Sequence, residues 1–405
     1  MKTELLKKLG RINTIPAGWK LTTVGKVCKI RNDLRKPLST EERAKIQGAY
    51  PYYGPTGVLD FIDHHLVEGL FALIGEDGDH FLKPEQKAQT LLVNGKFNVN
   101  NHAHLIQGTE KCSSEWFFLY FHHRDITHLI SRQGASRYKL NKDTLSKLPI
   151  LVPPLNEQLE IYKLFTTWHN AIEKTEALIA AKEKQFEWLR SHLISSSRTN
   201  QTLKFGDFLT ESRIPDTTQD PERRLTVRLH LKGVSVRDYR GTESTDATKY
   251  FHRKSGQLIY GKQNVFRGSI GIVPSHLDGY SSSQDIPAFD IADNVNSKWL
   301  YWYLSRPSFY SWLENFSAGS GSKRLHPKEL FKISVDLPTL EDQKRISDSL
   351  NLADKEIRLL KKTLEQYRSQ KRGLMQKLLT GEWQVTSAQV GAEGELQDRT
   401  KENVA

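Results

Sequence analysis

The sequence predicts an α+β protein with two mixed, β-rich domains and two long helices that pack antiparallel as a coiled coil, in a pseudo-two-fold arrangement. Three observations predict this fold class. A phrase occurs twice, as ILVPPLNEQLEI at 150–161 and as VDLPTLEDQKRI at 335–346. Each copy opens a long heptad pattern, and each heptad pattern follows a stretch of short, turn-bounded strands.

The phrase belongs to a longer internal repeat with an offset of 185 residues. The offset superimposes these residues without a gap: Gly134 and Gly319, Leu145 and Leu330, Lys147 and Lys332, Pro153 and Pro338, Gln158 and Gln343. Upstream, with a small slip, EWFFLY at 115–120 matches KWLYWY at 298–303. Each half therefore predicts an aromatic helix, a Gly/Ser-rich basic loop, a short strand, a proline break and a long helix.

Each long helix is expected to begin at its proline break. Proline disfavours the helical conformation in the residue before it, so a strand cannot continue as helix through Pro153 or Pro338. In the second copy Thr339 is expected to cap the helix, with Asp342 three residues later. In the first copy Asn156 is the expected cap.

The two helices carry a heptad pattern of mostly apolar residues that step alternately by four and three. A seam of this kind over four heptads is typical of a coiled coil. Helices of about 38 residues would be roughly 57 Å long. The predicted seam residues are Ile161, Phe165, Trp168, Ile172, Ile179, Phe186, Leu189 and Leu193 in the first helix, and Ile346, Leu350, Ile357, Leu360, Leu364, Leu374 and Leu378 in the second.

The order of domain, helix, domain and helix predicts how the chain folds back. The first helix leads to the second domain, and the second helix most compactly returns toward the first, so the two helices should run antiparallel. The predicted boundaries are 1–155 for the first domain, 156–197 for the first helix, 198–339 for the second domain, 340–382 for the second helix and 383–405 for a disordered polar tail.

The charge of the chain favours a polyanionic partner. The 405 residues contain 59 Lys and Arg against 47 Asp and Glu, a net charge of +12. Such a surplus binds nucleic acid by displacing counterions from phosphates, although a basic protein without such a partner has the same composition. Two cysteines, no apolar run of membrane-spanning length and no signal peptide lead us to expect a cytoplasmic protein that contacts no membrane.

Several phrases resemble the specificity subunit of type I restriction–modification enzymes. The most specific are PPLNEQ and PTLEDQ at the two helix starts, within the domain–helix repeat. YPYYGPTGV, IGEDGDH and NVNNHAHLI in the first domain, and VRLHLKGV and LIYGKQNVFRGSIGIVP in the second, are similar to the target-recognition domains of that family.

The resemblance implies that each domain is a target-recognition domain that reads one half of a split site in double-stranded DNA. The helices would then set the spacing and dock two methyltransferase subunits, through which restriction and translocase subunits join. It further implies that this chain is not itself an enzyme and binds no cofactor, because S-adenosylmethionine, ATP and Mg²⁺ are used by the partner subunits. The recognised site should be asymmetric, because the two domains share little sequence.

Other functions remain open on the sequence. A coiled-coil adaptor that binds proteins without reading DNA would share the helices, and a related multi-subunit restriction system would share the layout. A metal-dependent nuclease is a further alternative, resting on EQK at 85–87 after Asp77. We interpret that cluster as a solvated loop, and His102 and His104 as strand residues rather than metal ligands.

Two other motifs resemble catalytic or nucleotide-binding signatures. VPPL at 152–155 has the two prolines of a methyltransferase motif but neither flanking residue, so we interpret it as a helix boundary. GQLIYGKQ at 256–263 nearly matches a phosphate-binding loop, but Gln263 replaces the hydroxyl residue and no apolar helix follows. We expect a strand and a turn there.

The candidate DNA-binding residues are cations, amides and one tyrosine in loops of the two domains. Arginine and lysine can reach phosphates or groove edges, and Gln and Asn can read adenine. The predicted residues are Arg35, Lys36, Arg132, Gln133, Arg137, Tyr138 and Lys139 in the first domain, and Arg237, Arg240, Lys262, Gln263, Asn264, Arg267, Lys323 and Arg324 in the second. A wider set adds Arg31, Lys249, Arg253, Lys254 and Gln284.

Overall fold

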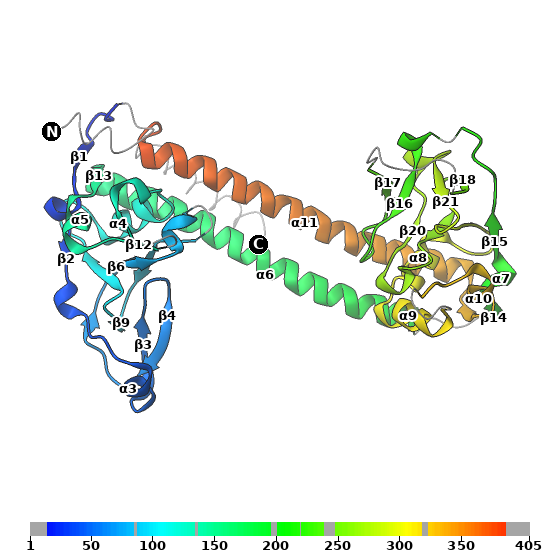
Figure 1. Cartoon of the computed structure of the whole chain (residues 1–405), viewed down its shortest axis with the longest axis horizontal. Helices are drawn as coiled ribbons and strands as arrows, with labels where there is room; N and C mark the ends of the chain where they lie inside the picture. The colour runs from blue at the N-terminus through cyan, green and yellow to red at the C-terminus, as the bar shows by residue number, and fades with distance from the viewer. Residues whose placement is uncertain are drawn as a thin grey trace, which may run out of the picture. The chain divides into compact units, whose positions relative to one another are not determined.

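The chain forms two compact units in a computed structural model. Unit 1 comprises Met1–Lys174 and Leu364–Ala405, and unit 2 comprises Thr175–Thr363. The structure describes residues 14–84, 87–133, 137–195, 201–218, 220–238, 248–317 and 323–385. Each unit contains a β-rich body and a part of each long helix (Figure 1). Arg240, Glu85 and the predicted tail from 386 lie outside the described residues.

Both units are built on the same antiparallel frame. In unit 1 a four-stranded sheet has the order β2 (Lys29–Ile30), β10 (Ala103–Gln107), β6 (Phe71–Gly75) and β8 (Thr90–Val93). In unit 2 the corresponding order is β15 (Leu209–Ser212), β22 (Ala288–Ile291), β19 (Leu258–Tyr260) and β20 (Ile270–Ile272). All pairs within both sheets are antiparallel.

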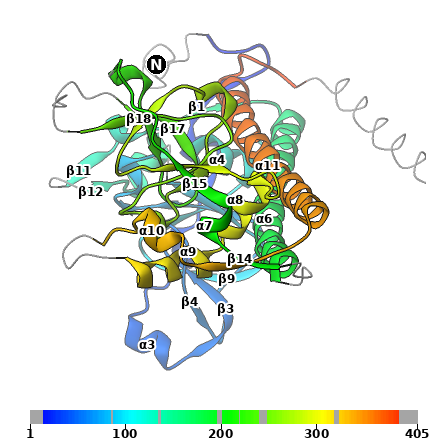
Figure 2. The same ribbon diagram turned by 90° about the vertical axis from the view of Figure 1, so that its right-hand side faces the viewer.

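The frame closes in the same way in each unit. β1 (Lys20–Thr23) pairs with β13 (Pro149–Val152), and β14 (Gln201–Lys204) pairs with β23 (Ser334–Leu337). The first strand of each pair runs into a one-turn helix, α2 (Val24–Val27) or α7 (Phe205–Phe208). Before the second strand come an aromatic helix, α4 (Ser114–Phe121) or α8 (Ser297–Leu304), and a short helix, α5 (Lys142–Lys147) or α10 (Pro327–Leu330). Figure 2 shows unit 2 from the side on which α7, α8 and β15 are labelled.

The additional strands differ between the units. Unit 1 adds a mixed sheet of β4 (Val58–Ile62), β3 (Gln47–Tyr53), β9 (Lys96–Val99) and β5 (Val67–Glu68), and a small sheet of β11 (Ser131–Gln133), β12 (Arg137–Lys139) and β7 (Asp77–Gly78). Unit 2 instead adds two short ladders, β16 (Leu225–Val227) with β17 (Val234–Val236) and β18 (Tyr250–His252) with β21 (Ser281–Ser283). A common frame therefore carries different insertions.

The two long helices α6 (Leu155–Ser195) and α11 (Leu340–Thr380) have 41 residues each. Thr339 caps α11 as predicted, since its Oγ1 accepts from the Asp342 amide at 3.2 Å. The cap predicted at Asn156 is wrong, because α6 begins one residue earlier and includes Asn156 in its first turn. There the backbone N–H of Gln158 donates to the Pro154 carbonyl at 3.0 Å, so Pro154 is the N-cap residue of α6.

Contacts within each unit show that the helices run antiparallel. In unit 1, Ile161 and Phe165 share a core cluster with Leu378, while the Trp168 ring lies 5.7 Å from that of Tyr367, further back along α11. In unit 2 the later residues of α6 pack in one cluster with Ile346 and Leu350 near the start of α11. The predicted fold class is confirmed.

The predicted seam residues near the ends of the helices lie in these contacts. All fifteen are buried or half-buried in the structure. Ion pairs flank the seam in unit 2, where Lys182 Nζ lies 2.9 Å from Glu356 Oε1 and Lys361 Nζ lies 2.6 Å from Glu183 Oε1. Such half-exposed pairs contribute little free energy but favour one register of the two helices.

A buried glutamine joins each long helix to its aromatic helix. In unit 1 the Gln158 Oε1 accepts from the amide of Ser113, the N-cap of α4, at 2.9 Å. The Gln158 Nε2 donates to the carbonyls of Lys111 at 3.0 Å and Pro153 at 2.9 Å. The side chain has no exposed surface. We call this set of contacts the glutamine junction.

Unit 2 repeats the glutamine junction contact for contact. The Gln343 Oε1 accepts from the amide of Asn296, the N-cap of α8, at 2.7 Å. Its Nε2 donates to the carbonyls of Asn294 at 3.2 Å and Pro338 at 2.9 Å. The repeated phrase therefore encodes a hydrogen-bonded corner that turns the chain from strand into long helix and attaches that helix to the domain.

The first described residues of unit 1 meet the end of α11. Gln384 Nε2 donates to the Ala17 carbonyl at 2.9 Å, and Trp19 Nε1 donates to Glu157 Oε2 at 3.0 Å. Burial raises the pKa of the Glu157 carboxyl, opposed by its hydrogen bond from Trp19. Trp19 thus attaches the first described segment to the first turn of α6, and Gln384, just after the end of α11, attaches to the same segment.

His80 is a buried, uncharged side chain in the core of unit 1. It is 1% exposed, and its Nε2 has no hydrogen-bond partner among the described residues. The imidazole occupies the space where side chains of Gly75 and Gly78 would lie, which explains both glycines of IGEDGDH. Burial lowers the pKa of His80 to about 4.

Among the described residues, none of the helices combines the length and the hydrophobicity of a membrane-spanning segment.

We predict that Gln343→Leu destabilises unit 2. The substitution removes the acceptor of the buried Asn296 amide and the donor of two carbonyls, at a cost of about 3 kcal/mol in the free energy of unfolding. Urea denaturation followed by circular dichroism measures this loss. Gln185→Leu, at an exposed position of α6, is the matched control and should change stability by less than about 0.5 kcal/mol. Equal losses in the two variants would contradict the role of the junction.

We also predict that unit 1 loses stability as the pH falls from 6.5 toward 4. In this window His80 binds a proton in the unfolded state but not in the folded state. Protonation therefore lowers the free energy of unfolding, by up to about 3 kcal/mol. The difference in unfolding free energy between the wild type and His80→Asn should therefore shrink between pH 7 and pH 4.5. Burial also lowers the pKa of His122, to about 3, so the variant should retain part of the slope. The exposed His276→Asn serves as control, and an unchanged difference would exclude His80 as a source of the slope.

Candidate nucleic-acid interface

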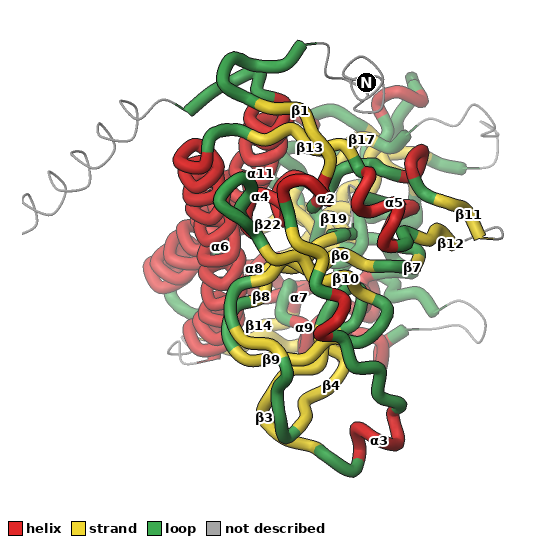
Figure 3. The backbone as a smooth tube through the Cα atoms, turned by 90° about the vertical axis from the view of Figure 1, so that its left-hand side faces the viewer, coloured by secondary structure: helices red, strands yellow, loops and turns green. Residues whose placement is uncertain are grey.

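In unit 1 the predicted DNA-binding residues lie around a three-stranded sheet at the surface. β12 pairs with β11 on one side and with β7 on the other, so that Tyr138 lies opposite Gly78 and Lys139 opposite Asp77 (Figure 3). Arg132 is exposed, while Tyr138 and Lys139 are half-exposed. The side chains of Gln133 and Arg137 lie outside what the structure describes. The pairing brings a basic hairpin beside the IGEDGDH segment.

Arg35 is held in place by acceptors of the same sheet region. Its Nη1 donates to Glu76 Oε2 at 2.7 Å and to the Asn101 carbonyl at 2.9 Å. About a fifth of each of the Arg35 and Glu76 side chains is exposed. Lys36, next along the chain, donates its backbone amide to the Val99 carbonyl at 3.0 Å and leaves its side chain exposed. One cation is thus fixed and its neighbour extends into solvent.

The two histidines of NVNNHAHLI have structural partners. His104 is 1% exposed, its Nε2 donates to the Leu140 carbonyl at 2.6 Å, and its Nδ1 accepts from Asn32 Nδ2 at 2.8 Å. Burial lowers the pKa of His104 and favours the neutral ring that these bonds require. His102 lies 3.1 Å from the Asp77 carboxylate. The described residues contain no group of three or more His, Cys, Asp or Glu that could hold a metal ion.

In unit 2 the predicted residues gather at the turn after β19. The Lys262 amide donates to the Asp285 carbonyl at 2.9 Å, and the Lys262 carbonyl accepts from the Leu325 amide at 3.0 Å. Arg324 Nη1 donates to Asp285 Oδ1 at 3.3 Å. Burial lowers the pKa of Lys262, and the Asp285 carboxylate opposes that shift. Two predicted cations therefore share one acidic neighbour.

This turn does not have the structure of a phosphate-binding loop. β19 is followed by a single 3-10 turn (Val265–Arg267) that ends at Gly268 with φ of 72°, where glycine is favoured. The interpretation of GQLIYGKQ as a strand and a turn is confirmed. Gln263 and Arg267 are exposed, and Asn264 is half-exposed.

A second loop from β16–β17 lies on this turn. The amides of His230 and Leu231 each donate at 2.9 Å, to the carbonyls of Arg267 and Gly268. Both residues have φ in the left-handed region, 58° and 57°, a backbone conformation that is energetically costly for residues other than glycine. Arg228, His230 and Lys232 are exposed in VRLHLKGV. The loop adds basic side chains to those of the turn.

The remaining candidates are separate from these clusters. Lys323 Nζ lies 2.8 Å from Glu314 Oε1 in an exposed pair, and Arg237 is exposed just after β17. Arg253 of the wider set is wrong as a DNA contact, because it is only 1% exposed. Its guanidinium donates to Ser282 Oγ at 2.7 Å and to the Ser212 carbonyl at 2.9 Å. Burial lowers the pKa of Arg253 to about 10, and this cation supports the fold of unit 2.

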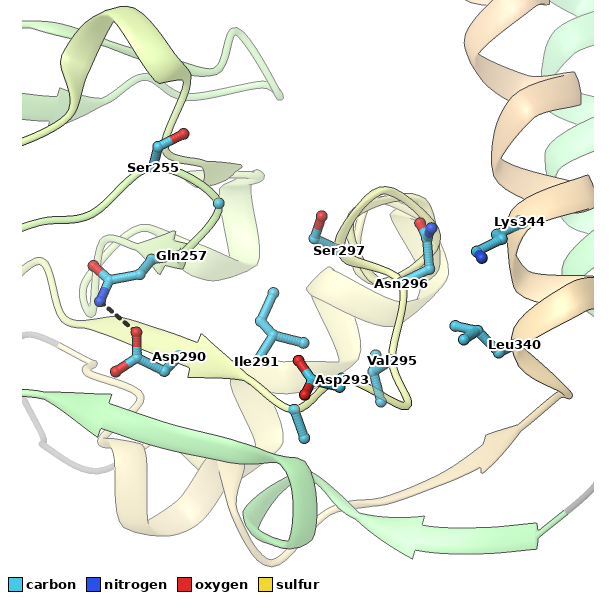
Figure 4. Close-up of a pocket in the computed structure, with 12 residues that line it drawn as sticks. Ser255, Gln257, Asp290, Ile291, Asp293, Val295, Asn296, Ser297, Leu340 and Lys344 are labelled. Atoms are coloured by element: carbon cyan, nitrogen blue, oxygen red, sulfur yellow. Dashed lines mark hydrogen bonds between the residues drawn. The ribbon is translucent and has the colours of Figure 1, made fainter.

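A polar depression of about 460 Å³ lies elsewhere in unit 2 (Figure 4). Its residues come from the loop before β19, from the end of β22 and the loop that leads to α8, and from the start of α11, including Leu340 and Lys344. Gln257 Nε2 donates to Asp290 Oδ1 at 2.8 Å, and Gln257 Oε1 accepts from the Lys254 amide at 2.9 Å. These polar groups satisfy one another and none of the predicted site residues lines the depression, so we assign it no role.

The arrangement suits binding to a phosphate backbone and to base edges. Each unit presents exposed cations on loops next to amides or an aromatic ring, supported from behind by buried hydrogen bonds. Sequence reasoning missed the acceptors that orient the cations, Glu76 and Asp285, and the left-handed turn at His230. The family-like phrases IGEDGDH and VRLHLKGV mark two of these three places but carry no pattern from which the contacts could be derived.

Comparison with known proteins agrees with this picture. The family profile described as the type I restriction modification DNA specificity domain matches residues 16–182 and 237–367. A putative type I restriction enzyme specificity subunit of Haemophilus influenzae is 27% identical over 350 residues, covering 82% of this chain and 86% of the relative. The MjaVIII specificity subunit of a type I restriction enzyme from Methanocaldococcus jannaschii is 20% identical over 95% of this chain and 97% of its own length.

A solved structure has the same fold. The crystal structure of the S subunit of a type I restriction–modification system from M. genitalium aligns with a TM-score of 0.57 at 14% identity, covering 92% of this chain and 98% of that chain. The family profile covers well over half of the sequence and both copies of the repeat. The chain therefore belongs to the family of type I restriction–modification DNA specificity proteins, the non-catalytic recognition component of such systems.

Proposed function

We propose that the protein reads a bipartite, asymmetric DNA site and docks methyltransferase subunits, and restriction and translocase subunits through them. The observation that carries this proposal is the common frame with different insertions. Two frames that present unlike loops can read two unlike half-sites, and the repeated helices attach to both frames through the same glutamine junction.

The proposed division of labour follows the boundaries predicted from the sequence. Residues 1–155 and 198–339 would be the two target-recognition domains, 156–197 and 340–382 the helices that set their spacing, and 383–405 a tail. Helices of 41 residues have a length of about 62 Å, longer than the roughly 34–36 Å between half-sites one turn of DNA apart. This length supports a role in spacing.

The proposed contacts with DNA come from the loop clusters of the two units. The exposed Lys36, Arg132, Gln263 and Arg267, with the half-exposed Lys139, would approach phosphates and groove edges. Arg35 and Arg324, oriented by carboxylates, would make directed contacts. We further propose that the chain binds no cofactor of its own, that its partners use S-adenosylmethionine, ATP and Mg²⁺, and that it acts on cellular DNA in the cytoplasm.

Replacing residues 1–150 by the first domain of another family member tests the division into two readers. Only one half of the recognised site should change, because the second unit keeps its own loops. Sequencing of modified adenines in cells that contain the matching methyltransferase measures the site. A change in both halves would contradict the proposal, and absence of site-specific adenine modification in cells with the unaltered chain and its methyltransferase would favour a protein-binding adaptor.

Inserting four residues near the middle of both α6 and α11 tests the spacing role. Each insertion adds about 6 Å of helix, so the number of unread base pairs between the half-sites should change while both half-sites remain the same. The same adenine mapping reports the outcome. Insertion of four residues into one helix alone, which breaks the match between the two seams, is the control and should abolish modification. An unchanged spacer in the double insertion would exclude the helices as the determinant of spacing.

A further inference from the structure

The residue just beyond the third strand of the frame sheet in unit 1 is held between two neighbouring segments. The strand is β6 and the residue is Glu76. The Glu76 amide donates to the His102 carbonyl at 2.7 Å, and the Glu76 carbonyl accepts from the Leu140 amide at 2.7 Å. His102 comes directly before β10, and Leu140 directly follows the basic hairpin of β11 and β12. The backbone of Glu76 is therefore fixed from both sides.

Unit 2 repeats this arrangement at Lys262, just beyond β19. The Lys262 amide donates to the Asp285 carbonyl at 2.9 Å, and the Lys262 carbonyl accepts from the Leu325 amide at 3.0 Å. Asp285 comes shortly before β22, the counterpart of β10, and Leu325 is 185 residues after Leu140. We call the position that Glu76 and Lys262 share the bracketed position. It is equivalent in the two units, although its side chain is acidic in one and basic in the other.

The bracketed position lies at the end of the strand that is opposite to the attachment of the long helix. Just before β6, the Leu70 carbonyl accepts from Ser114 Oγ in the first turn of α4 at 3.3 Å. Just before β19, Gln257 lines the same depression as Leu340 at the start of α11. Five or six extended residues separate these contacts from the bracketed position, a distance of roughly 16 to 20 Å. One end of the strand thus meets the helices, and the other end presents the variable side chains.

In unit 1 the bracketed side chain presents a cation from another segment. Arg35 Nη1 donates to Glu76 Oε2 at 2.7 Å and to the Asn101 carbonyl at 2.9 Å. Within the part of the chain that the structure describes, the Nε and Nη2 groups of Arg35 donate to no residue. Arg35 therefore keeps two parallel N–H groups for a ligand, on a guanidinium whose orientation is already fixed.

In unit 2 the bracketed side chain is itself the cation. Lys262 is half-exposed, and its Nζ forms no hydrogen bond to any residue that the structure describes. The Asp285 carboxylate favours the charged form of Lys262, and it also accepts from Arg324 Nη1 at 3.3 Å. Both units therefore offer unused N–H donors at the bracketed position, beside a carboxylate.

A fixed, partly buried cation beside a carboxylate suits a base edge better than a phosphate. The carboxylate offsets part of the positive charge, so the attraction to the DNA backbone is weaker than at an isolated cation. Guanine presents two adjacent acceptors, O6 and N7, in the major groove, and arginine and lysine are the side chains that pair with them. The exposed Lys36, Arg132 and Arg267 lack such carboxylate partners among the printed contacts of the described residues and suit phosphates.

We infer that the bracketed position is where each unit reads a guanine of its half-site, through Arg35 held by Glu76 in unit 1 and through Lys262 in unit 2. The inference rests on the proposed function and deepens it, because it assigns base readout to one equivalent position of the two frames. Glu76 is a positioning residue, since it acts on DNA through Arg35. Each half-site then contains one G·C pair whose identity depends on one named cation.

Lys262→Met tests the inference in unit 2. The full chain, in complex with the methyltransferase subunit of its own system, first serves to map the recognised site. Rates of adenine modification are then measured on duplexes that carry each of the four base pairs at each position. The variant should lose about tenfold or more of its discrimination at one G·C pair of one half-site and keep it at all other positions. Arg267→Met, at an exposed cation of the same turn, is the matched control and should slow modification of all duplexes alike.

Arg35→Met and Glu76→Gln test the inference in unit 1. Arg35→Met should lose about tenfold or more of the discrimination at one G·C pair of the other half-site. Glu76→Gln keeps an oxygen acceptor for the guanidinium but not the charge, so it should relax the same pair by a smaller factor. A merely structural role of Glu76 would lower the thermal unfolding temperature without selecting one base pair. If circular dichroism shows that Arg35→Met is unfolded, Arg35→Lys, which keeps the charge and removes the fork, takes its place.

Three results would decide against these assignments. An even loss of modification on all duplexes in the Lys262 and Arg35 variants, as in the Arg267 control, would show phosphate contacts and overturn the inference while leaving the proposed function intact. Relaxation at an A·T pair would also overturn it, because the reading of guanine would be wrong. Absence of site-specific modification by the wild-type complex would instead refute the proposed function itself.

Discussion

The architecture depends on a buried glutamine at the first turn of each long helix. A primary amide has two donor hydrogens and an acceptor oxygen, and at Gln158 and Gln343 all of these functions are used on backbone groups. A buried side chain so fully satisfied holds the N-terminus of an aromatic helix, the carbonyl after a strand and the start of a long helix in one arrangement. The rest of each domain can vary around this corner.

That variation is what a DNA-reading protein needs. The frame sheets of both units have the same strand order, yet one frame carries a mixed sheet and a basic hairpin while the other carries two short ladders and a left-handed turn. Loops placed on a rigid scaffold can change their chemistry without loss of the core. In both units the exposed cations lie beside residues that are fixed by carboxylates, Glu76 in one and Asp285 in the other.

The long helices separate two properties that a coiled coil usually combines. Most seam positions are apolar in both copies of the repeat, because apolar side chains there are buried between the helices, although Phe186 corresponds to Lys371 and Leu360 to Thr175. The outer flank has no such constraint, and it differs between the copies of the repeat, apolar at Leu352 and Leu359 and polar at Thr167 and Lys174. A duplicated chain can therefore keep one internal geometry and still expose unlike outer surfaces.

The sequence by itself determined the repeat, the two helices, their antiparallel course and the family, because heptad spacing, proline breaks and a constant offset are local or periodic signals. It placed the helix starts within one residue and missed only the cap at Asn156. Tertiary structure alone decided which cations are available. Arg253 is a core residue, Arg35 is held by Glu76 from a segment 41 residues away, and Gln158 bonds to residues more than 40 positions earlier. Such contacts join segments distant in the chain, and no spacing within either segment records its partner.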